Sequence, residues 1–282
     1  MTKLILSVSP HIYGKRTTQK IMLDVIIALL PAAAASVLIF GPRTLLVIGV
    51  CAAVSVCSEF VFEKLCKREN TVYDLSAIVT GMLLAYNLPV SIPLWQAAFG
   101  SVTAVIVVKQ LFGGIGQNFA NPAITARIVM MTAFSGTMTN WIYSATPKTP
   151  DAVSSPTPLI AAAKGTTSMM PSYTELLLGR HGGCLGETCA LALLLGGAYL
   201  LIRRVISWHT PAAFIGTVAL MSLICGKDPL YQILSGGLIT ILIRFWGNLP
   251  EGVSFSILLM NIFTPYISKL TRMKPLTGGV EL

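Results

Sequence analysis

The stretch IMLDVIIALLPAAAASVLIF, residues 21–40, decides the fold. Its twenty residues hold a single charged side chain, Asp24, and about twenty apolar residues are what an α-helix needs to cross the hydrocarbon core of a bilayer. The whole chain shares this character, because 54% of its 282 residues are hydrophobic and only 11% are charged. A soluble domain carries about 25% charged residues. The sequence therefore predicts an all-α fold, a polytopic bundle of membrane helices.

Eight further apolar segments follow this first span, at residues 44–62, 75–88, 93–112, 123–134, 184–202, 212–225, 230–246 and 253–270. The third of the nine spans is short for a bilayer and is interrupted by Asn87 and Pro89. Short, broken spans are typical of repeat-built transporters, where they lie near the middle of the membrane. Asn121 and Pro122 predict the N-cap and the first residue of the fifth span.

Basic residues indicate how the spans are oriented. A basic cluster at 64–68 follows the second span, and Arg203–Arg204 follows the sixth. Such clusters stay in the cytoplasm. We therefore expect the N-terminal segment 1–20 in the cytoplasm and the polar interval 136–183 on the outer face. The net charge of +9 lies at span ends and not along one face, which argues against nucleic-acid binding.

The number of spans conflicts with this orientation at the C-terminus. Nine spans would place the basic tail 271–282 outside the cytoplasm. The sequence Ser235-Gly236-Gly237-Leu238 also fuses two apolar runs of half length. Our hypothesis is that a segment is missing near 237/238 and that the true fold has about ten transmembrane helices. They would form two repeats with broken helices, at 21–135 and 184–270.

The interval 136–183 has no apolar run long enough to cross a bilayer. At its centre lies Asp151-Ala-Val-Ser154-Ser155-Pro156-Thr157-Pro158-Leu159. The prolines fix φ and prevent a helix from forming, so the hydroxyl groups are displayed. The hydroxyl groups of Ser154, Ser155 and Thr157 make this segment the candidate site. We expect no metal site, because no two of the six cysteines have the two-residue gap of a zinc or iron-sulfur ligand set. No residue is assigned a catalytic role.

Arg127 lies about six residues inside the fifth span, so its guanidinium must face protein, water or an anion. The sequence is compatible with two roles for Arg127, a structural ion pair and a functional contact. The acidic residues closest to the spans are expected to be mostly solvated helix ends; they are Asp24, Glu59, Asp74 and Glu187. Most of the six cysteines are expected to be small residues of the membrane core.

Five motifs occur in order along nearly the whole chain: Ser9-Pro10-His11, the glycine- and asparagine-rich stretch 112–123, the segment 151–159, Gly186-Glu187-Thr188 and Phe245-Trp246-Gly247. In this series the sequence resembles the D subunits of Rnf ion-translocating oxidoreductase complexes, which are homologous to the B subunit of the sodium-translocating NADH:quinone oxidoreductase. The resemblance implies a multi-pass subunit of a prokaryotic inner-membrane complex, with both termini in the cytoplasm. It would relay electrons in a chain coupled to Na+ or H+ export, would not be catalytically complete alone, and would have the other Rnf subunits and the lipid bilayer as partners.

The resemblance also implies FMN joined through its phosphate to Thr157 by a flavin transferase, which reads the pattern Asp-x-x-Ser-Gly-Ala-Thr. Asp151, Ser154 and Thr157 match this pattern, whereas Ser155 and Pro156 depart from it. The proline stiffens the approach to Thr157, which puts the efficiency of the transferase in doubt. A second, non-covalent flavin such as riboflavin is compatible with the resemblance. Family members carry a motif of the Ala-Thr-Asp-Pro-Val type after the Leu-Ser-Gly-Gly run. In this sequence no such motif comes after Ser235-Gly236-Gly237.

Two other functions are compatible with parts of the sequence. The broken third span and the helix start at Asn121 are also what a channel-like solute or ion transporter subunit without a redox cofactor would show. A scaffold subunit that only seals a complex is the third candidate. The pattern from Asp151 to Thr157 favours the flavin carrier, because a simple channel has no need for it. The chain alone is not expected to bind NAD or ferredoxin, since it has no Gly-x-Gly-x-x-Gly fingerprint with a following acidic residue.

Overall fold

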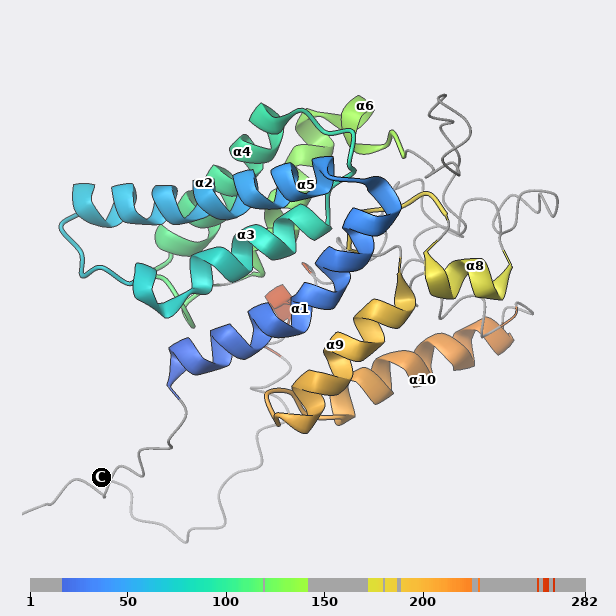
Figure 1. The fold of residues 1–282 in the computed structure, drawn as a ribbon. Coiled ribbons are helices and arrows are strands. Elements are labelled where there is room, and N and C mark those ends of the chain that lie inside the picture. Colours follow the sequence, from blue (N-terminus) through green and yellow to red (C-terminus); the bar gives the residue numbers. More distant parts are fainter. Residues whose placement is uncertain are drawn as a thin grey trace, which may run out of the picture.

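The computed structural model describes residues 17–118, 120–141, 172–179, 181–186, 189–224, 228, 258, 261–263 and 266. Within these residues every regular element is a helix, as the sequence predicted (Figure 1). Several predictions concern residues outside this part. They are the spans 230–246 and 253–270, apart from a few positions, the join at 237/238, the tail 271–282, and the candidate residues Asp151, Ser154 and Thr157.

The first two helices form a long hairpin and confirm the first two predicted spans. Helix α1 covers Thr18–Phe40 and α2 covers Arg43–Leu65, and each is about 35 Å long at 1.5 Å per residue. Among the described residues these are the two helices long and apolar enough to cross a membrane. The Thr17 side chain caps the start of α1. Gly41 ends the helix with a φ angle of 85°, and this backbone conformation favours glycine.

The third span is confirmed as short and broken. After the 3-10 turn η1, Val72–Asp74, helix α3 covers only Ser76–Tyr86, about 16 Å and therefore half of the hydrocarbon core. The chain then turns back into α4, Leu94–Val102. This helix continues as η2, Thr103–Gln110, which is π-helical.

Helix α5, Pro122–Ala133, begins where the sequence predicted. The Asn121 side-chain oxygen accepts from the backbone N–H groups of Ala123 and Ile124, and Pro122 occupies the first turn. At 12 residues α5 is also shorter than a bilayer crossing. A further short helix, α6, covers Ser135–Met138.

The remaining described helices are α8, Tyr173–Leu178, α9, Ala190–Ile202, and α10, His209–Ile224. Helix α9 begins later than the predicted span at 184, because Leu185 and Gly186 make backbone hydrogen bonds to the end of α3 and the segment after it. It packs along α1 at Gly196, where an added Cβ would lie 2.2 Å from the Ala28 carbonyl oxygen. Figure 1 shows α9 and α10 as a hairpin beside α1.

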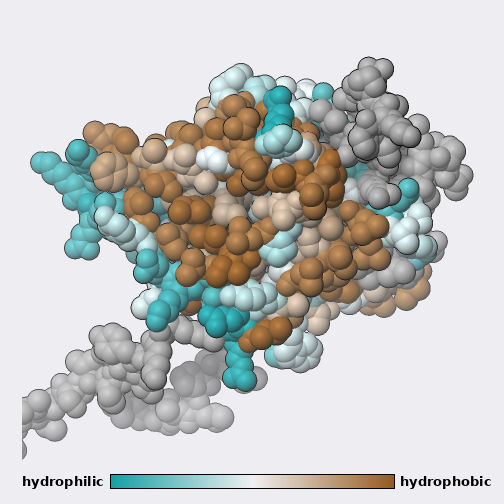
Figure 2. Space-filling view, viewed as in Figure 1, coloured by the Kyte–Doolittle hydropathy of each residue, from teal (hydrophilic) through white to brown (hydrophobic). Residues whose placement is uncertain are grey.

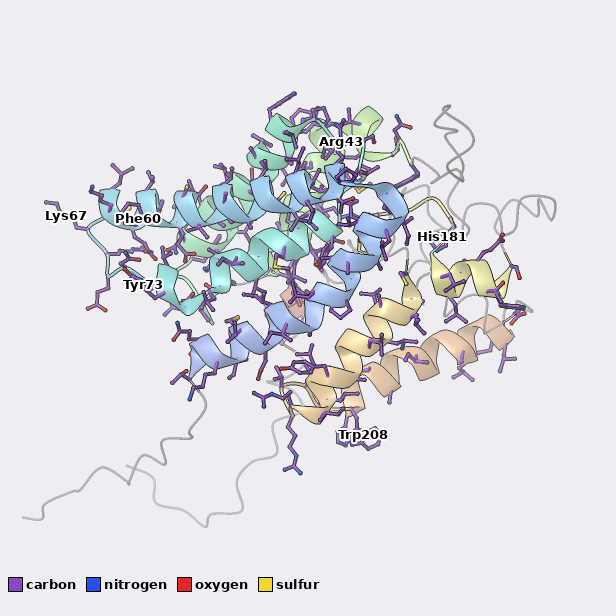
Figure 3. The ribbon with its side chains drawn as sticks, viewed as in Figure 1. Arg43, Phe60, Lys67, Tyr73, His181 and Trp208 are labelled. Atoms are coloured by element: carbon purple, nitrogen blue, oxygen red, sulfur yellow. The ribbon has the colours of Figure 1, made fainter. Side chains whose placement is uncertain are left out.

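The bundle has two ends of different character. The basic end carries Lys64 in the last turn of α2, Lys67 and Arg68 after it, and Arg203 and Arg204 after α9. The opposite end carries Arg43 and the helices α6 and α8. Figure 3 shows Lys67 and Tyr73 at one end of the molecule, and Arg43 and His181 at the other. In Figure 2 apolar side chains cover the middle of the visible face, and hydrophilic groups gather toward the basic end. This distribution fits helices that cross a membrane.

Apolar side chains from α2, α3, α4 and α5 fill the core of the first repeat. They include Val47, Leu84, Ala97, Met130 and Met131. Small residues bring the backbones close, since an added Cβ at Gly81 of α3 would meet the Cys51 carbonyl oxygen of α2 at 2.7 Å. Close approach through small residues is how helices associate in lipid. The two half-length helices α3 and α5 are therefore held inside a packed frame.

Candidate functional site

The two sides of the polar interval are fixed at the opposite end of the bundle. On the N-terminal side, the Thr137 hydroxyl donates to the Gln96 side-chain oxygen at 2.7 Å, and the Ser91 hydroxyl donates to the Asn140 carbonyl at 3.1 Å. Trp141 is buried. On the C-terminal side, Ser172 begins α8 with a capping box. The residues flanking the interval thus lie at the end that carries Arg43, while Asp151, Ser154 and Thr157 themselves lie outside the described residues.

A second attachment joins the segment before α9 to the break after α3. The Leu185 backbone N–H donates to the Leu88 carbonyl at 3.1 Å, and the Gly186 N–H donates to the Tyr86 carbonyl at 2.9 Å. The Ser36 hydroxyl of α1 donates to the Leu185 carbonyl. An added Cβ at Gly186 would lie 2.4 Å from the Tyr86 Cβ. Glycine is therefore required here by the close approach of the two segments.

Arg127 lies at this junction and joins three elements. Its guanidinium donates to the Asn87 side-chain oxygen at 2.8 Å and to the Cys184 sulfur at 3.0 Å. The Asn87 amide in turn donates to the Leu83 carbonyl at the end of α3. A positive charge is favourable at a helix C-terminus. Arg127 is buried, so the prediction that it faces protein and not lipid is confirmed.

A buried charged cluster lies at the basic end, between α2, η1 and η2. The Lys109 ammonium is 2.6 Å from the Glu59 carboxylate, and both side chains are 2% exposed or less. Gln110 donates to Glu59 at 2.7 Å and to Glu63 at 3.2 Å. The Thr71 hydroxyl contacts both carboxylates. Intramembrane ionisable groups are costly, and they mark functional sites more often than surface charges do.

The burial of two acidic residues corrects the expectation that most of those near spans are solvated ends. Glu59 is 0% and Asp24 8% exposed. Asp74 is half-buried, and Glu187 lies outside the described residues. Asp24 accepts from the Arg203 guanidinium at 3.1 Å and from the Tyr199 hydroxyl at 3.1 Å. Each of the two carboxylates faces a cation and further donors from other elements, which offsets part of the cost of burying its charge. Partners distant in sequence cannot be recognised from the local pattern around each residue.

The π-helical turn η2 explains why two consecutive residues serve the same cluster. Its Leu111 N–H donates to the Ile106 carbonyl, five residues back, at 3.0 Å. A wider turn holds one more residue than an α-helical turn, so the directions of Lys109 and Gln110 diverge less than on an α-helix. Both side chains reach α2, and both are buried. π-Turns inside α-helices are frequent at functional sites.

The sequence profile of the NQR2, RnfD, RnfE family matches residues 5–240 and 234–277. The two matches together cover almost the whole chain. The chain belongs to the NQR2, RnfD, RnfE family. Members of this family are membrane proteins, in agreement with the apolar helices described above.

Individual relatives in the NQR2, RnfD, RnfE family agree with this assignment. The chain is 43% identical to the D subunit of the Na(+)-translocating ferredoxin:NAD(+) oxidoreductase complex of Acetobacterium woodii, over 95% of this chain and 94% of the relative. It is 34% identical to the D subunit of the proton-translocating ferredoxin:NAD(+) oxidoreductase complex of Clostridium ljungdahlii, with the same coverage. It is 32% identical to the D subunit of the ion-translocating oxidoreductase complex of Alcanivorax borkumensis, over 98% of this chain and 97% of the relative.

The family comparison also bears on the sequence around Gly237. The two profile matches meet and overlap at residues 234–240. The alignment to the Acetobacterium protein spans 301 positions, although 95% of this chain is only about 268 residues. About 33 aligned positions therefore hold no residue of this chain. Relatives in the NQR2, RnfD, RnfE family carry residues that this sequence lacks.

Cysteines are divided between core and surface. Cys51 and Cys184 are buried and Cys189 is half-buried, whereas Cys57 and Cys66 are exposed. The expectation of a core position is therefore wrong for Cys57 and Cys66, and Cys225 lies outside the described residues. No group of three or more potential metal ligands occurs among the residues that the structure describes.

Proposed function

We propose that this chain is the D subunit of an ion-translocating ferredoxin:NAD(+) oxidoreductase complex, the Rnf complex. In it the chain carries FMN covalently bound to Thr157 and relays electrons in a chain coupled to export of Na+ or H+. The observation that carries the assignment is the 43% identity to a subunit of that name over 95% of the chain. The chain is one subunit of a translocase and needs the other Rnf subunits for turnover.

The site for the flavin is proposed from the sequence of the polar interval. Asp151, Ser154 and Thr157 stand at the spacing that a flavin transferase reads in the family that the chain resembles. Thr157 would supply the hydroxyl that bonds to the FMN phosphate, and the prolines on either side keep this hydroxyl out of a helix. A flavin accepts electrons singly or in pairs, while the protein supplies position and electrostatics. A second, non-covalent flavin such as riboflavin belongs to the same proposal.

The orientation in the membrane follows from the charge of the two ends. The basic end would face the cytoplasm, because basic clusters next to spans are retained there. The end that fixes Trp141 and Ser172 would then face outward, and so would the flavin-bearing interval between them. Partners of this subunit would be the other Rnf subunits within a prokaryotic cell membrane, and the flavin transferase during maturation.

One structural observation favours the alternative of a channel-like transporter subunit without a redox cofactor. Helices α3 and α5 end within the bundle, and buried charges lie beside them. Half-length helices around a polar centre are typical of transporters. An electron-transfer subunit of an ion-translocating complex shares these features, because it too must accommodate the ion. The presence of covalent flavin separates the two functions.

In-gel flavin fluorescence of the denatured protein tests the proposal. The chain is produced together with the flavin transferase and the other subunits, with Thr157→Ala and Thr166→Ala as a matched pair of variants in the same interval. We expect a fluorescent band for the wild type and for Thr166→Ala, and none for Thr157→Ala. A wild-type band without fluorescence, with active transferase present, would favour the channel-like function over the flavin-carrying one.

We also propose that the natural fold has about ten transmembrane helices and that the sequence lacks part of its second repeat near 237/238. The overlap of the profile matches at 234–240 and the unmatched positions in the alignments support this. About 33 residues suffice for one bilayer crossing and its connections. One more crossing brings the basic tail 271–282 back to the cytoplasmic side.

A further inference from the structure

The Glu59–Lys109 cluster holds more negative than positive side-chain charge. The cluster contains two buried carboxylates, Glu59 and Glu63, and one buried ammonium, that of Lys109, which pairs with Glu59. Lys64, Lys67 and Arg68 follow Glu63 closely in sequence, but all three are exposed, and the Arg68 guanidinium donates to the Gln110 carbonyl at 2.8 Å. An uncompensated charge is costly inside a membrane protein. The carboxylate pair therefore favours a cation, and in this structure the Lys109 ammonium is that cation.

The oxygen atoms of the cluster are not fully used. The Glu59 Oε1 atom accepts from Lys109, Gln110 and Thr71. The Glu59 Oε2 atom is buried and has no hydrogen-bond partner. Buried polar atoms are nearly always partnered, so an orphan oxygen calls for an explanation. The Ser76 hydroxyl accepts from the Lys109 ammonium at 2.5 Å and adds another oxygen atom to the cluster.

Lys109 occupies the place that a free cation would take on Glu59. Its ammonium is a compact point charge at the end of a flexible stem. The side chain reaches Glu59 from η2 because of the π-helical turn described above. A change of this turn to α-helix shifts the register by one residue, which turns the following side chains by about 100° around the helix axis. The side chains of Lys109 and Gln110 would then both move away from the two carboxylates.

We propose that Lys109 is a tethered cation that fills the Glu59–Glu63 carboxylate pair in this conformation, and that a π-to-α rearrangement of Thr103–Gln110 withdraws it, leaving the pair to bind one monovalent cation, H+ or Na+. The cation would enter from the basic end, where Thr71 is exposed and contacts both carboxylates. Lys109 is thus a positioning residue, and η2 is the element that moves it. This proposal does not depend on the flavin at Thr157.

Thermal unfolding of the full chain in detergent tests the tethered cation. Wild type and Lys109→Met are compared in sodium and in choline chloride of equal ionic strength, and across pH in choline chloride. The wild-type midpoint should be the same in both salts. In Lys109→Met the midpoint should rise by about 3 °C or more when a cation replaces the ammonium. A rise with Na+ at fixed pH identifies sodium, and a rise on acidification without Na+ identifies the proton. The other charged groups of the cluster's surroundings, Arg68 and Asp74, are present in both proteins. A Lys109→Met midpoint that responds to neither cation overturns the proposal.

One further variant keeps the test decisive if Lys109→Met does not fold. Glu59→Gln combined with Lys109→Met removes both charges of the pair, and should fold and lose any response to cations. If this double variant is as poorly folded as the single one, Lys109 serves packing, and the proposal fails.

Discussion

The Arg127 guanidinium donates a 2.8 Å hydrogen bond to the Asn87 side-chain oxygen, across the point where α3 ends in the middle of the bundle. This bond, together with the contact to Cys184, ties the half-length helices α3 and α5 to the segment that precedes α9. A broken helix leaves unpaired carbonyl groups at its end. Here the Asn87 amide satisfies the Leu83 carbonyl, and Arg127 holds that amide in place.

Removal of the Arg127 charge should therefore loosen the centre of the bundle. We expect Arg127→Met to lower the free energy of unfolding by about 2–3 kcal/mol, because hydrogen bonds to a charged group are lost inside the protein. Asn87→Ala should lower the free energy of unfolding by a smaller amount. The effects of the two substitutions should not add, since the residues share one network. Denaturation of the four proteins in detergent measures this coupling, and strictly additive effects would show that the bond between Arg127 and Asn87 is not important.

The contact between α1 and α9 predicts opposite outcomes for two neighbouring glycines. At Gly196 an added Cβ would lie 2.2 Å from the backbone oxygen of Ala28, whereas at Gly197 nothing lies within 4 Å. Gly196→Ala should therefore separate the helices and cost about 1–3 kcal/mol. Gly197→Ala should be neutral or slightly stabilising, since alanine is the better helix former. Thermal midpoints of both variants decide this, and equal midpoints would contradict the close packing of α9 on α1.

The contact between Tyr173 and Asp228 predicts a loss of stability at high pH. The Tyr173 hydroxyl donates to the Asp228 carboxylate. This hydrogen bond, then burial, and then the negative charge of Asp228 raise the pKa of the Tyr173 phenol above its usual value. An acid whose pKa is raised on folding stabilises the fold below its unfolded pKa, about 10 for tyrosine. That contribution is lost as the pH rises through the higher folded value.

The Tyr173 prediction can be followed by tyrosinate absorbance. The difference between wild type and Tyr173→Phe isolates this phenol, which should titrate above about pH 10. Asp228→Asn should move its titration back toward that value. Stability of the wild type should also fall more steeply with alkaline pH than that of Tyr173→Phe. A phenol that titrates at the same pH with and without the Asp228 charge would rule out the contact.

Flavin attachment should be limited by the residues between Ser154 and Thr157. Pro156 stands where the transferase pattern has alanine, and it fixes the backbone next to the acceptor. We expect Pro156→Ala to increase the rate of flavin incorporation when the transferase is limiting, with Pro158→Ala as the control beyond the acceptor. The measurement is the time course of in-gel fluorescence. An unchanged rate would show that the transferase tolerates proline at this position.

Local rules of sequence predicted the helices of the first repeat well. The apolar length of 21–40, the cap at Asn121 and the break at Asn87 each depend on neighbouring residues, and the structure confirms all three. The Glu59–Lys109 pair was not predicted, because fifty residues separate its members and a π-turn aims the lysine. The late start of α9 has the same origin, since the backbones of Leu185 and Gly186 bond to residues near the end of α3, far away in the sequence. Pairing between distant segments leaves no local pattern in a single sequence.

The missing segment near 237/238 can be tested on the protein purified from its natural source. The sequence corresponds to 30.1 kDa for 282 residues, and about 33 additional residues would add about 3.5 kDa at the same mean residue mass. We therefore expect an intact mass well above 30.1 kDa, even after subtraction of a bound flavin. Trypsin provides an independent check, because cleavage after Lys227 and Arg244 yields one peptide across the join, DPLYQILSGGLITILIR. Detection of that peptide with an intact mass of 30.1 kDa would establish that the two half-length runs are continuous, and the chain would then have one bilayer crossing fewer than proposed.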